Sequence, residues 1–238
     1  MTTDVTRRRF LQATGTAAAT AAALTGTSAA AEQPAAPVKI VAVCCSPRKG
    51  KTTAQALATC LESAQAVSPD TIQTELIELA GLNIPGQLAA GVALAPGEKD
   101  DFPAVAAKLS DPTVAGIVVG TPTYFANMTS LCKAFIDRCG VFRKNGFVLA
   151  NRVGGVLAVG GVRNGGQELV IQSVQAALMC QEMIVVGDGR PTAHFGATLW
   201  NAGADDIAAD EFGTATAKNL GRRVAEVALS RCIVTCNV

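Results

Sequence analysis

The chain has 238 residues, enough for one large domain or two small ones. Hydrophobic residues make up 49% of it and charged residues 16%, so the chain can bury a large core and is not of the intrinsically disordered class. No stretch stays apolar over the length of a membrane span, and we expect no stable membrane insertion.

The first 31 residues have the features of an export signal. Arg7-Arg8-Arg9-Phe10-Leu11 matches the twin-arginine pattern, a weakly apolar stretch follows, and Ala29-Ala30-Ala31 is a small-residue cleavage site. We therefore expect a twin-arginine signal peptide at 1–31, a linker at 32–37 and one domain at 38–238, located in the periplasm or outside the cell. Two alternatives remain open: an alanine-rich leader that carries its arginines by chance, and an uncleaved, membrane-anchored form.

Removal of this leader takes away three arginines and one aspartate, which leaves 17 basic against 18 acidic residues. A chain so close to neutral offers no electrostatic basis for binding nucleic acid, and we expect none as a partner.

A strand, a polar loop and a helix follow one another from residue 38. Residues 38–44 form an apolar, β-branched run, as in a strand buried on both faces, and the apolar spacing from residue 54 on indicates a helix. The loop amides and the helix N-terminus would converge on one point, a geometry that binds phosphate. The candidate phosphate-binding residues are Ser46, Pro47, Arg48, Lys51, Thr52 and Thr53.

Three interpretations of this loop stay open on its own sequence. Gly50-Lys51-Thr52 looks like the end of a P-loop, but Cys45 stands where that motif requires its first glycine. The second interpretation is a loop that binds the terminal phosphate of a mononucleotide. The third is an ordinary strand-to-helix turn with a solvated basic tip.

The remaining pattern alternates strands and helices, which predicts a doubly wound α/β sheet. Asn127 or Thr129 is the candidate N-cap of the central helix. We expect an edge strand at 71–79, buried strands at 113–120 and 153–160, and a short strand at 183–186, with helices at 100–110, 128–141, 169–181 and 204–231.

Ligands of such folds lie beyond the carboxyl ends of the strands. Two further loops join the first at that edge, and the three together suit a flavin mononucleotide, with the aromatic residues and glycines beside a flat ring. Tyr124 and Phe125 are either core aromatics or ring contacts, and the glycines either form a plain turn or admit the ring. The candidates in these two loops are Pro122, Thr123, Tyr124, Phe125, Ala126, Asn127, Gly160, Gly161, Arg163, Gly165 and Gly166.

The loops resemble those of the NADPH-dependent FMN reductase and iron–sulfur flavoprotein family. The first loop, Cys45 to Thr53, is similar to its Gly-Ser-Pro-Arg-…-Asn-Thr loop, although Cys45 and Thr52 replace a glycine and an asparagine. The segment 120–128 is similar to its Gly-(Thr/Ser)-Pro-Thr-Tyr-Phe-Gly-Asn-Met motif, residues 133–138 continue the match, and residues 160–168 resemble its third loop.

This resemblance implies a flavodoxin-like fold, a five-stranded parallel sheet of order 2-1-3-4-5 between two helical layers. It implies FMN as cofactor, NADPH or NADH as electron donor, and free flavin, a quinone or another small oxidant as the redox substrate. We expect a homodimer or homotetramer and assign no catalytic acid or base. Two other functions stay open: a P-loop phosphotransferase, and a non-catalytic binding or electron-carrier protein on the same fold.

The eight cysteines do not predict a metal site. The iron–sulfur branch has a cysteine cluster after its second strand, whereas no cysteine lies between Cys60 and Cys132 here, so we expect a flavoprotein without a cluster. Cys44 and Cys45 should face opposite sides of the sheet, and buried free thiols are the leading interpretation. A disulfide stays open for an exported chain, with Cys232 and Cys236 the pair that could meet. His194 is either an ordinary loop histidine or a residue near the ligand.

Overall fold

A computed structural model describes residues 37–235, and within them the sheet is parallel throughout. The strand order is β2-β1-β3-β4-β5, and β6 also pairs with β4. The expected flavodoxin-like order is therefore confirmed. The strands are β1 (Val38–Cys44), β2 (Ile72–Glu78), β3 (Val114–Pro122), β4 (Val153–Gly160), β5 (Ile184–Val185) and β6 (Ala197–Trp200).

Burial of the strands follows their positions in the sheet. Every residue of β4 is buried, and in β1 only Lys39 is partly exposed, because helices cover both faces of these strands. At the edge, only Ile72 and Ile77 of β2 are buried, as its mixed sequence predicts. Glu75 of β2 pairs with Lys39 and with Lys108, so the edge strand carries charges where it meets water.

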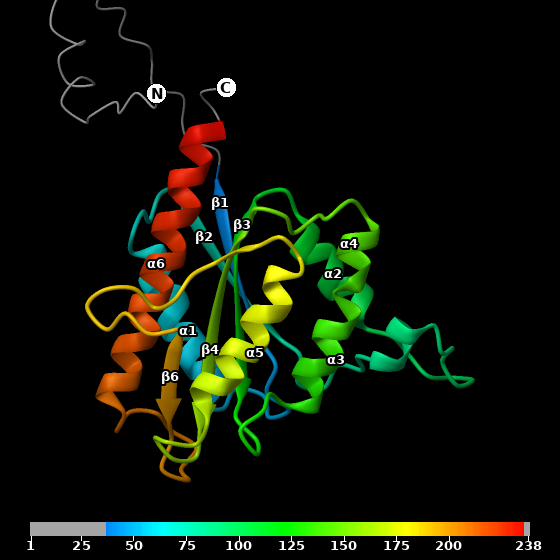
Figure 1. Cartoon of the computed structure of the whole chain (residues 1–238), viewed down its shortest axis with the longest axis horizontal. Helices are drawn as coiled ribbons and strands as arrows, with labels where there is room; N and C mark the ends of the chain where they lie inside the picture. The colour runs from blue at the N-terminus through cyan, green and yellow to red at the C-terminus, as the bar shows by residue number, and fades with distance from the viewer. Residues whose placement is uncertain (1–36, 236–238) are drawn as a thin grey trace, which may run out of the picture. The chain divides into compact units, whose positions relative to one another are not determined.

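Helices form a layer on each side of the sheet (Figure 1). The core that includes Leu57 and Leu220 lies under α1 and α6, and the core that includes Val105, Phe135 and Val170 lies under α2, α3 and α5. The helices are α1 (Thr52–Gln65), α2 (Phe102–Ser110), α3 (Ser130–Arg138), α4 (Gly140–Lys144), α5 (Gln167–Met179) and α6 (Glu211–Thr235), with a 3₁₀ helix η1 at Gly86–Ala90.

Two adjacent cysteines mark the two faces of the sheet. Cys44 belongs to the core under α1 and α6, whereas Cys45 belongs to the core under α2, α3 and α5. The expectation that they face opposite sides is confirmed.

A strand was expected at 183–186, and the structure has two short strands beside β4, namely β5 in that range and β6 further along the chain. β5 pairs with Val153 and Gly154, the chain then leaves the sheet, and it returns as β6 to pair with residues 157–160 of β4. Our sequence reading missed β6 because a four-residue strand carries little periodicity.

Two expected helices also differ in extent. The helix expected at 128–141 is divided at Cys139 into α3 and α4, and Thr129 is its N-cap, since its Oγ1 accepts from the amide of Cys132 at 3.1 Å. The terminal helix begins at Glu211 and not at 204. Asp210 ends the preceding loop, and its Oδ1 accepts from the amide of Gly213 at 2.9 Å, as an N-cap does.

The expected signal peptide, its cleavage site, the linker up to residue 36, and Cys236 lie outside the described residues. Among the described residues no helix is both long enough and apolar enough to cross a membrane.

Candidate functional site

The first loop joins β1 to α1 and is built as a tight turn. Its Ser46 Oγ accepts from the amide of Arg48 at 3.1 Å, and Gly50 has the left-handed φ of +67° that favours glycine. The amide of Gly50 donates to Glu78 Oε2 at 2.7 Å, which ties the loop to the end of β2. The loop therefore reaches α1 in a conformation held by its own polar contacts.

The N-terminus of α1 is open to an anion. Lys51 occupies the N-cap position without a side-chain cap hydrogen bond, so the first amides of α1 lack a partner of that kind. Thr53 is 1% exposed, and its Oγ1 is buried with no hydrogen-bond partner in the described structure. A buried hydroxyl beside free helix amides fits a phosphate oxygen, because that oxygen would accept from both.

Two of the three cations of this loop, Arg48 and Lys51, have a partner that the sequence did not indicate. Arg48 pairs with Asp205, and Lys51 Nζ lies 3.1 Å from the other carboxylate oxygen of Asp205. Hydrogen bonds from Lys51 and from Arg48 hold the pKa of the Asp205 carboxyl below its ordinary value. Arg48 and Lys51 are thus about half exposed and share one carboxylate partner.

The second loop is a strained two-residue turn. The backbone amides and carbonyls of Tyr124 and Asn127 bond each other at 2.9 Å in both directions, and φ is +51° at Phe125 and +56° at Ala126. Left-handed conformations cost non-glycine residues about 1 kcal/mol or more each, and such strain is concentrated at functional sites.

The aromatic side chains of this turn are not part of the core. Tyr124 is 47% exposed and Phe125 is 105% exposed, so both rings are available to a ligand. Thr123 Oγ1 is buried and has no hydrogen-bond partner in the described structure. Asn127 Oδ1 accepts from the next amide, that of Met128, at 2.9 Å and is not the helix cap.

Thr129 joins the first two loops. Its hydroxyl donates to the carbonyl of Cys45 at 2.7 Å, and its amide donates to Thr121 Oγ1 at 3.2 Å. Because the hydroxyl also caps α3, one buried side chain sets the distance between the first loop, the end of β3 and the following helix.

The third loop, residues 160–166, is organised by Gln167. Its buried amide donates to the carbonyls of Val162 at 2.6 Å and Leu199 at 3.2 Å, and its Oε1 accepts from Gly165 at 2.9 Å. A Cβ on Gly160 would lie 2.4 Å from Gln167 Nε2, so a larger residue at position 160 would collide with the Gln167 side chain.

Gly166 brings the second and third loops together. It has φ of +91°, and a Cβ there would lie 2.6 Å from the Cβ of Ala126. Any side chain at this position would therefore push the two loops apart. Gly161, in contrast, faces open space.

Arg163 of the third loop forms an ion pair with Asp210. Its guanidinium lies 2.5 Å from Asp210 Oδ1 and over the rings of Trp200 and Phe212, at 5.3 and 5.9 Å from their centroids. The other oxygen of Asp210 accepts from the amide of Trp200 at 2.8 Å. Asp210 thus links the third loop, β6 and α6.

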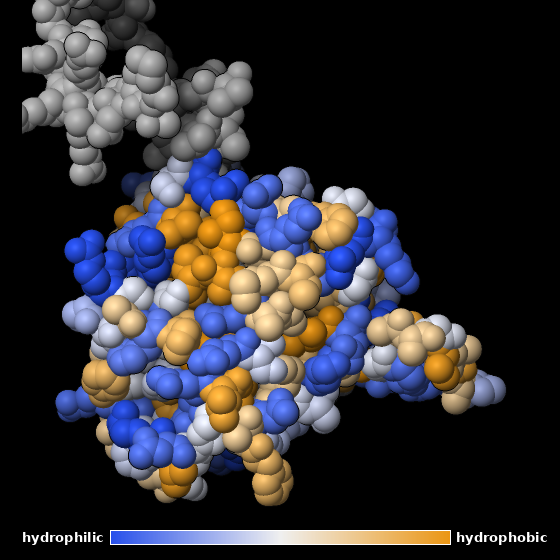
Figure 2. Space-filling view, viewed as in Figure 1, coloured by the Kyte–Doolittle hydropathy of each residue, from blue (hydrophilic) through white to orange (hydrophobic). Residues whose placement is uncertain are grey.

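His194 lies on the segment between β5 and β6. Its Nδ1 is 3.5 Å from a carboxylate oxygen of the fully buried Asp188, and its ring meets Phe212 edge-on at 5.9 Å. A cavity of about 440 Å³ lies between Arg163, His194 and Phe212, on the α5 side of the third loop. Figure 2 shows a face of the molecule on which hydrophilic and hydrophobic residues are mixed. Leu169, one of the residues that line the cavity, is exposed.

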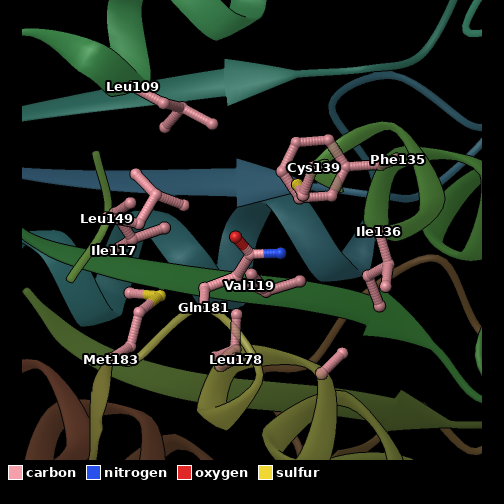
Figure 3. Close-up of a pocket in the computed structure, with 11 residues that line it drawn as sticks. Leu109, Ile117, Val119, Phe135, Ile136, Cys139, Leu149, Leu178, Gln181 and Met183 are labelled. Carbon is pink, nitrogen blue, oxygen red and sulfur yellow. The ribbon is translucent and has the colours of Figure 1, made fainter. Parts of the chain in front are cut away.

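A small cavity of about 20 Å³ lies in the core between β3, α3 and α5, remote from the three loops. Figure 3 shows Gln181 among apolar neighbours such as Leu109, Val119 and Leu178. The Oε1 of Gln181 has no partner in the described structure, but none of the residues that line this cavity belongs to the three loops.

Six cysteines are free thiols: Cys44, Cys45, Cys60, Cys132 and Cys139 are buried, and Cys180 is exposed. Burial raises the pKa of Cys44 to about 11 and that of Cys60 to about 12. These thiols are protonated at neutral pH and make poor nucleophiles.

All three predicted loops meet at the carboxyl edge of β1, β3 and β4, at the lower end of the sheet in Figure 1. Sequence reasoning missed Asp205 and Asp210, because it placed 204–210 inside a helix. The Asp-Glu pair before an apolar pattern at 210–211 was the available signal for a cap. Gln167 lies in the third motif and Thr129 directly follows the second, but neither was chosen as a site residue.

Comparison with known proteins agrees with this geometry. Residues 38–198 match the family model of the NADPH-dependent FMN reductases. An iron–sulfur flavoprotein of Methanocaldococcus jannaschii is 37% identical over 194 residues, which cover 80% of this chain and 97% of that protein. A NAD(P)H dehydrogenase (quinone) of Chromohalobacter salexigens is 37% identical over 119 residues, 48% of this chain and 55% of that protein.

A solved structure supports the fold. A flavodoxin, WrbA-like protein from Agrobacterium tumefaciens superposes with a TM-score of 0.57 at 17% identity, covering 81% of this chain and 98% of that one. The chain therefore belongs to the NADPH-dependent FMN reductase family, whose members are flavin-dependent oxidoreductases, and has the flavodoxin-like fold.

Proposed function

We propose that this protein binds FMN at the three loops and passes electrons from NADPH or NADH to a small acceptor, either free flavin, a quinone or another small oxidant. The observation that carries the proposal is a pair of buried hydroxyls without partners, Thr53 Oγ1 in the first loop and Thr123 Oγ1 in the second. Both belong to the loops that the family match implies for flavin, and both lack a partner that a ligand would supply.

The first loop would hold the phosphate. Ser46, Thr52 and Thr53 are buried at the N-terminus of α1, where the helix dipole and free amides favour a dianion. The second and third loops would hold the ring, with Tyr124 and Phe125 as apolar surfaces and the glycines of 160–166 giving close access to the backbone.

The chemistry belongs to the cofactor, since bound FMN accepts hydride and releases electrons singly or in pairs. The residues of the chain bind and orient it, and we assign none of them as an acid or base.

One experiment separates this proposal from its alternatives. Purified protein is mixed with FMN, freed of excess ligand, and titrated anaerobically with NADPH and NADH while the flavin absorbance is recorded. Retained flavin that either nucleotide bleaches supports the proposal. Flavin that neither nucleotide reduces indicates an electron carrier, and a colourless protein that binds ATP indicates a P-loop phosphotransferase.

We also propose that the domain works without an iron–sulfur cluster. The support is the absence of cysteine between Cys60 and Cys132 in the sequence, since a cluster needs about four thiolates close together. Iron and acid-labile sulfide should be far below one equivalent per chain. About four irons per chain would disprove this point.

Export through the twin-arginine route is part of the same proposal, supported by Arg7-Arg8 and the small-residue site at 29–31. Replacing Arg7 and Arg8 with Lys should retain the protein in the cytoplasm, and normal export of that variant would contradict this proposal.

We further propose that the protein forms a homodimer or a homotetramer. Light scattering during size-exclusion chromatography measures the mass of the assembly and tests this proposal.

A further inference from the structure

The segment between β6 and α6, residues 201–210, pairs with basic residues of two flavin loops. Its Asp205 contacts Arg48 and Lys51 of the first loop, and its Asp210 contacts Arg163 of the third. The three loops of the family motif therefore have a fourth neighbour, one that contributes carboxylates to a site that would take a phosphate dianion.

Asp205 is held in place by its own segment. The amide of Asn201 donates to the carbonyl of Gly160 at 3.0 Å, and the amide of Ala204 donates to the carbonyl of Asn201 at 2.7 Å. On the other side, Ile207 is buried. The segment is thus fastened on both sides of Asp205, so the backbone at Asp205 stays close to the first loop.

The carboxylate and a phosphate would need the same two cations. Arg48 and Lys51 adjoin the free N-terminus of α1 and the partnerless hydroxyl of Thr53, which point to an anion at this position. Asp205 already engages both cations, and its side chain, 48% exposed, can move away into water. An incoming phosphate must either displace it or remain beside a like charge, and both lower the affinity.

We propose that Asp205 is a specificity-determining residue of the flavin site, whose carboxylate competes with the phosphate of FMN for Arg48 and Lys51. This inference rests on the proposed function. It predicts that Asp205 weakens the binding of FMN without affecting riboflavin, which has the same ring and no phosphate. FMN would then dissociate from the protein more readily than it would if Arg48 and Lys51 had no carboxylate partner.

The test compares Asp205→Asn with Asp206→Asn, which removes the same formal charge one residue further along. Asp206 is exposed, forms no ion pair within the described structure, and its Oδ1 accepts only from the amide of Ala208, at 2.9 Å. FMN and riboflavin are titrated by fluorescence quenching at constant ionic strength. Asp205→Asn should tighten FMN binding by about three- to tenfold and leave riboflavin unchanged, while Asp206→Asn stays within about twofold of wild type.

Three outcomes overturn the inference. Weaker FMN binding by Asp205→Asn means that the carboxylate positions the cations and does not compete. An equal change in Asp206→Asn means a general effect of net charge, and an equal change for riboflavin means an effect on the ring.

A titration with inorganic phosphate, followed by the NMR shift of the Gly50 amide, keeps this test separate from the proposed function. If no variant binds flavin, the proposed function fails, yet Asp205→Asn should still bind phosphate more tightly than wild type. Unchanged phosphate affinity overturns the inference in either case.

Discussion

Thr53→Val should make the protein more stable and its FMN binding weaker. Valine has nearly the shape of threonine and the same branching at Cβ, so it replaces the Oγ1 hydroxyl with a methyl group and little else. The hydroxyl is buried without a partner in the flavin-free protein, whereas in our proposal it donates to the phosphate. One substitution therefore has opposite effects on two measurable quantities.

The magnitudes follow from those two environments. A buried polar group without a partner costs about 1–3 kcal/mol, so its removal should raise the free energy of unfolding of the flavin-free protein by about 1 kcal/mol. A hydrogen bond to a charged group is worth about 1.5–3 kcal/mol. Its loss should weaken FMN binding about ten- to a hundredfold and leave riboflavin binding unchanged.

Urea unfolding of the flavin-free protein measures the first quantity, and fluorescence titration with both flavins measures the second. Thr216→Val is the matched control, because the Thr216 hydroxyl is also buried but donates to the carbonyl of Gly213 at 2.7 Å and accepts from the amide of Thr198 at 3.1 Å. That variant should lose stability and keep its flavin affinity. Unchanged FMN affinity in Thr53→Val, or a loss of stability, would refute the reasoning.

Three further predictions concern the supporting structure. Gly166→Ala should lower the free energy of unfolding by about 1–3 kcal/mol, because the new Cβ meets Ala126 at 2.6 Å and φ is +91°. Gly161 faces open space, so Gly161→Ala should lower it far less in the same urea experiment. Asp210→Ala should lower the free energy of unfolding by at least about 2 kcal/mol, since it leaves the amide of Gly213 and the guanidinium of Arg163 without their acceptor. An unfolding midpoint equal to that of the wild type would contradict the role of Asp210 in linking these segments. Iodoacetamide at pH 8 should modify Cys180 and spare Cys44 in the folded protein, because a thiol whose pKa is raised to about 11 stays protonated until the pH approaches that value. Mass spectrometry measures the extent of labelling at each cysteine, and rapid labelling of Cys44 would contradict its burial.

The sequence by itself determined where the main strands lie along the chain and the positions of the three loops. Strands β1, β3 and β4 are covered on both faces, so their sequences are nearly continuous apolar runs. Such runs can be recognised as strands without knowledge of the tertiary structure. The loops follow directly, because polar and glycine residues after such a run mark the carboxyl edge of the sheet. The expectation that Cys44 and Cys45 face opposite sides is confirmed for the same reason, whereas the confirmed sheet order came from the resemblance to a known family.

Local pattern was less informative where the chain leaves the sheet and returns. β5 and β6 are short and share the edge of β4, so neither repeats often enough to be recognised, and the start of α6 depends on the cap formed by Asp210. The exposure of Tyr124 and Phe125 was likewise undecided, because an aromatic pair after a strand is compatible with the core or with a ligand. The left-handed turn at Phe125 and Ala126 directs both rings outward.

Only the tertiary structure decided which charges meet. Arg48 and Asp205 are 157 residues apart, and Arg163 and Asp210 are 47 apart, so no local periodicity relates either pair. Their meeting depends on β6 returning to the sheet beside β4, which places the β6–α6 segment over the ends of β1 and β4. An ion pair needs its two groups within a few ångströms, and that distance is set by how distant segments pack and not by either segment's own sequence.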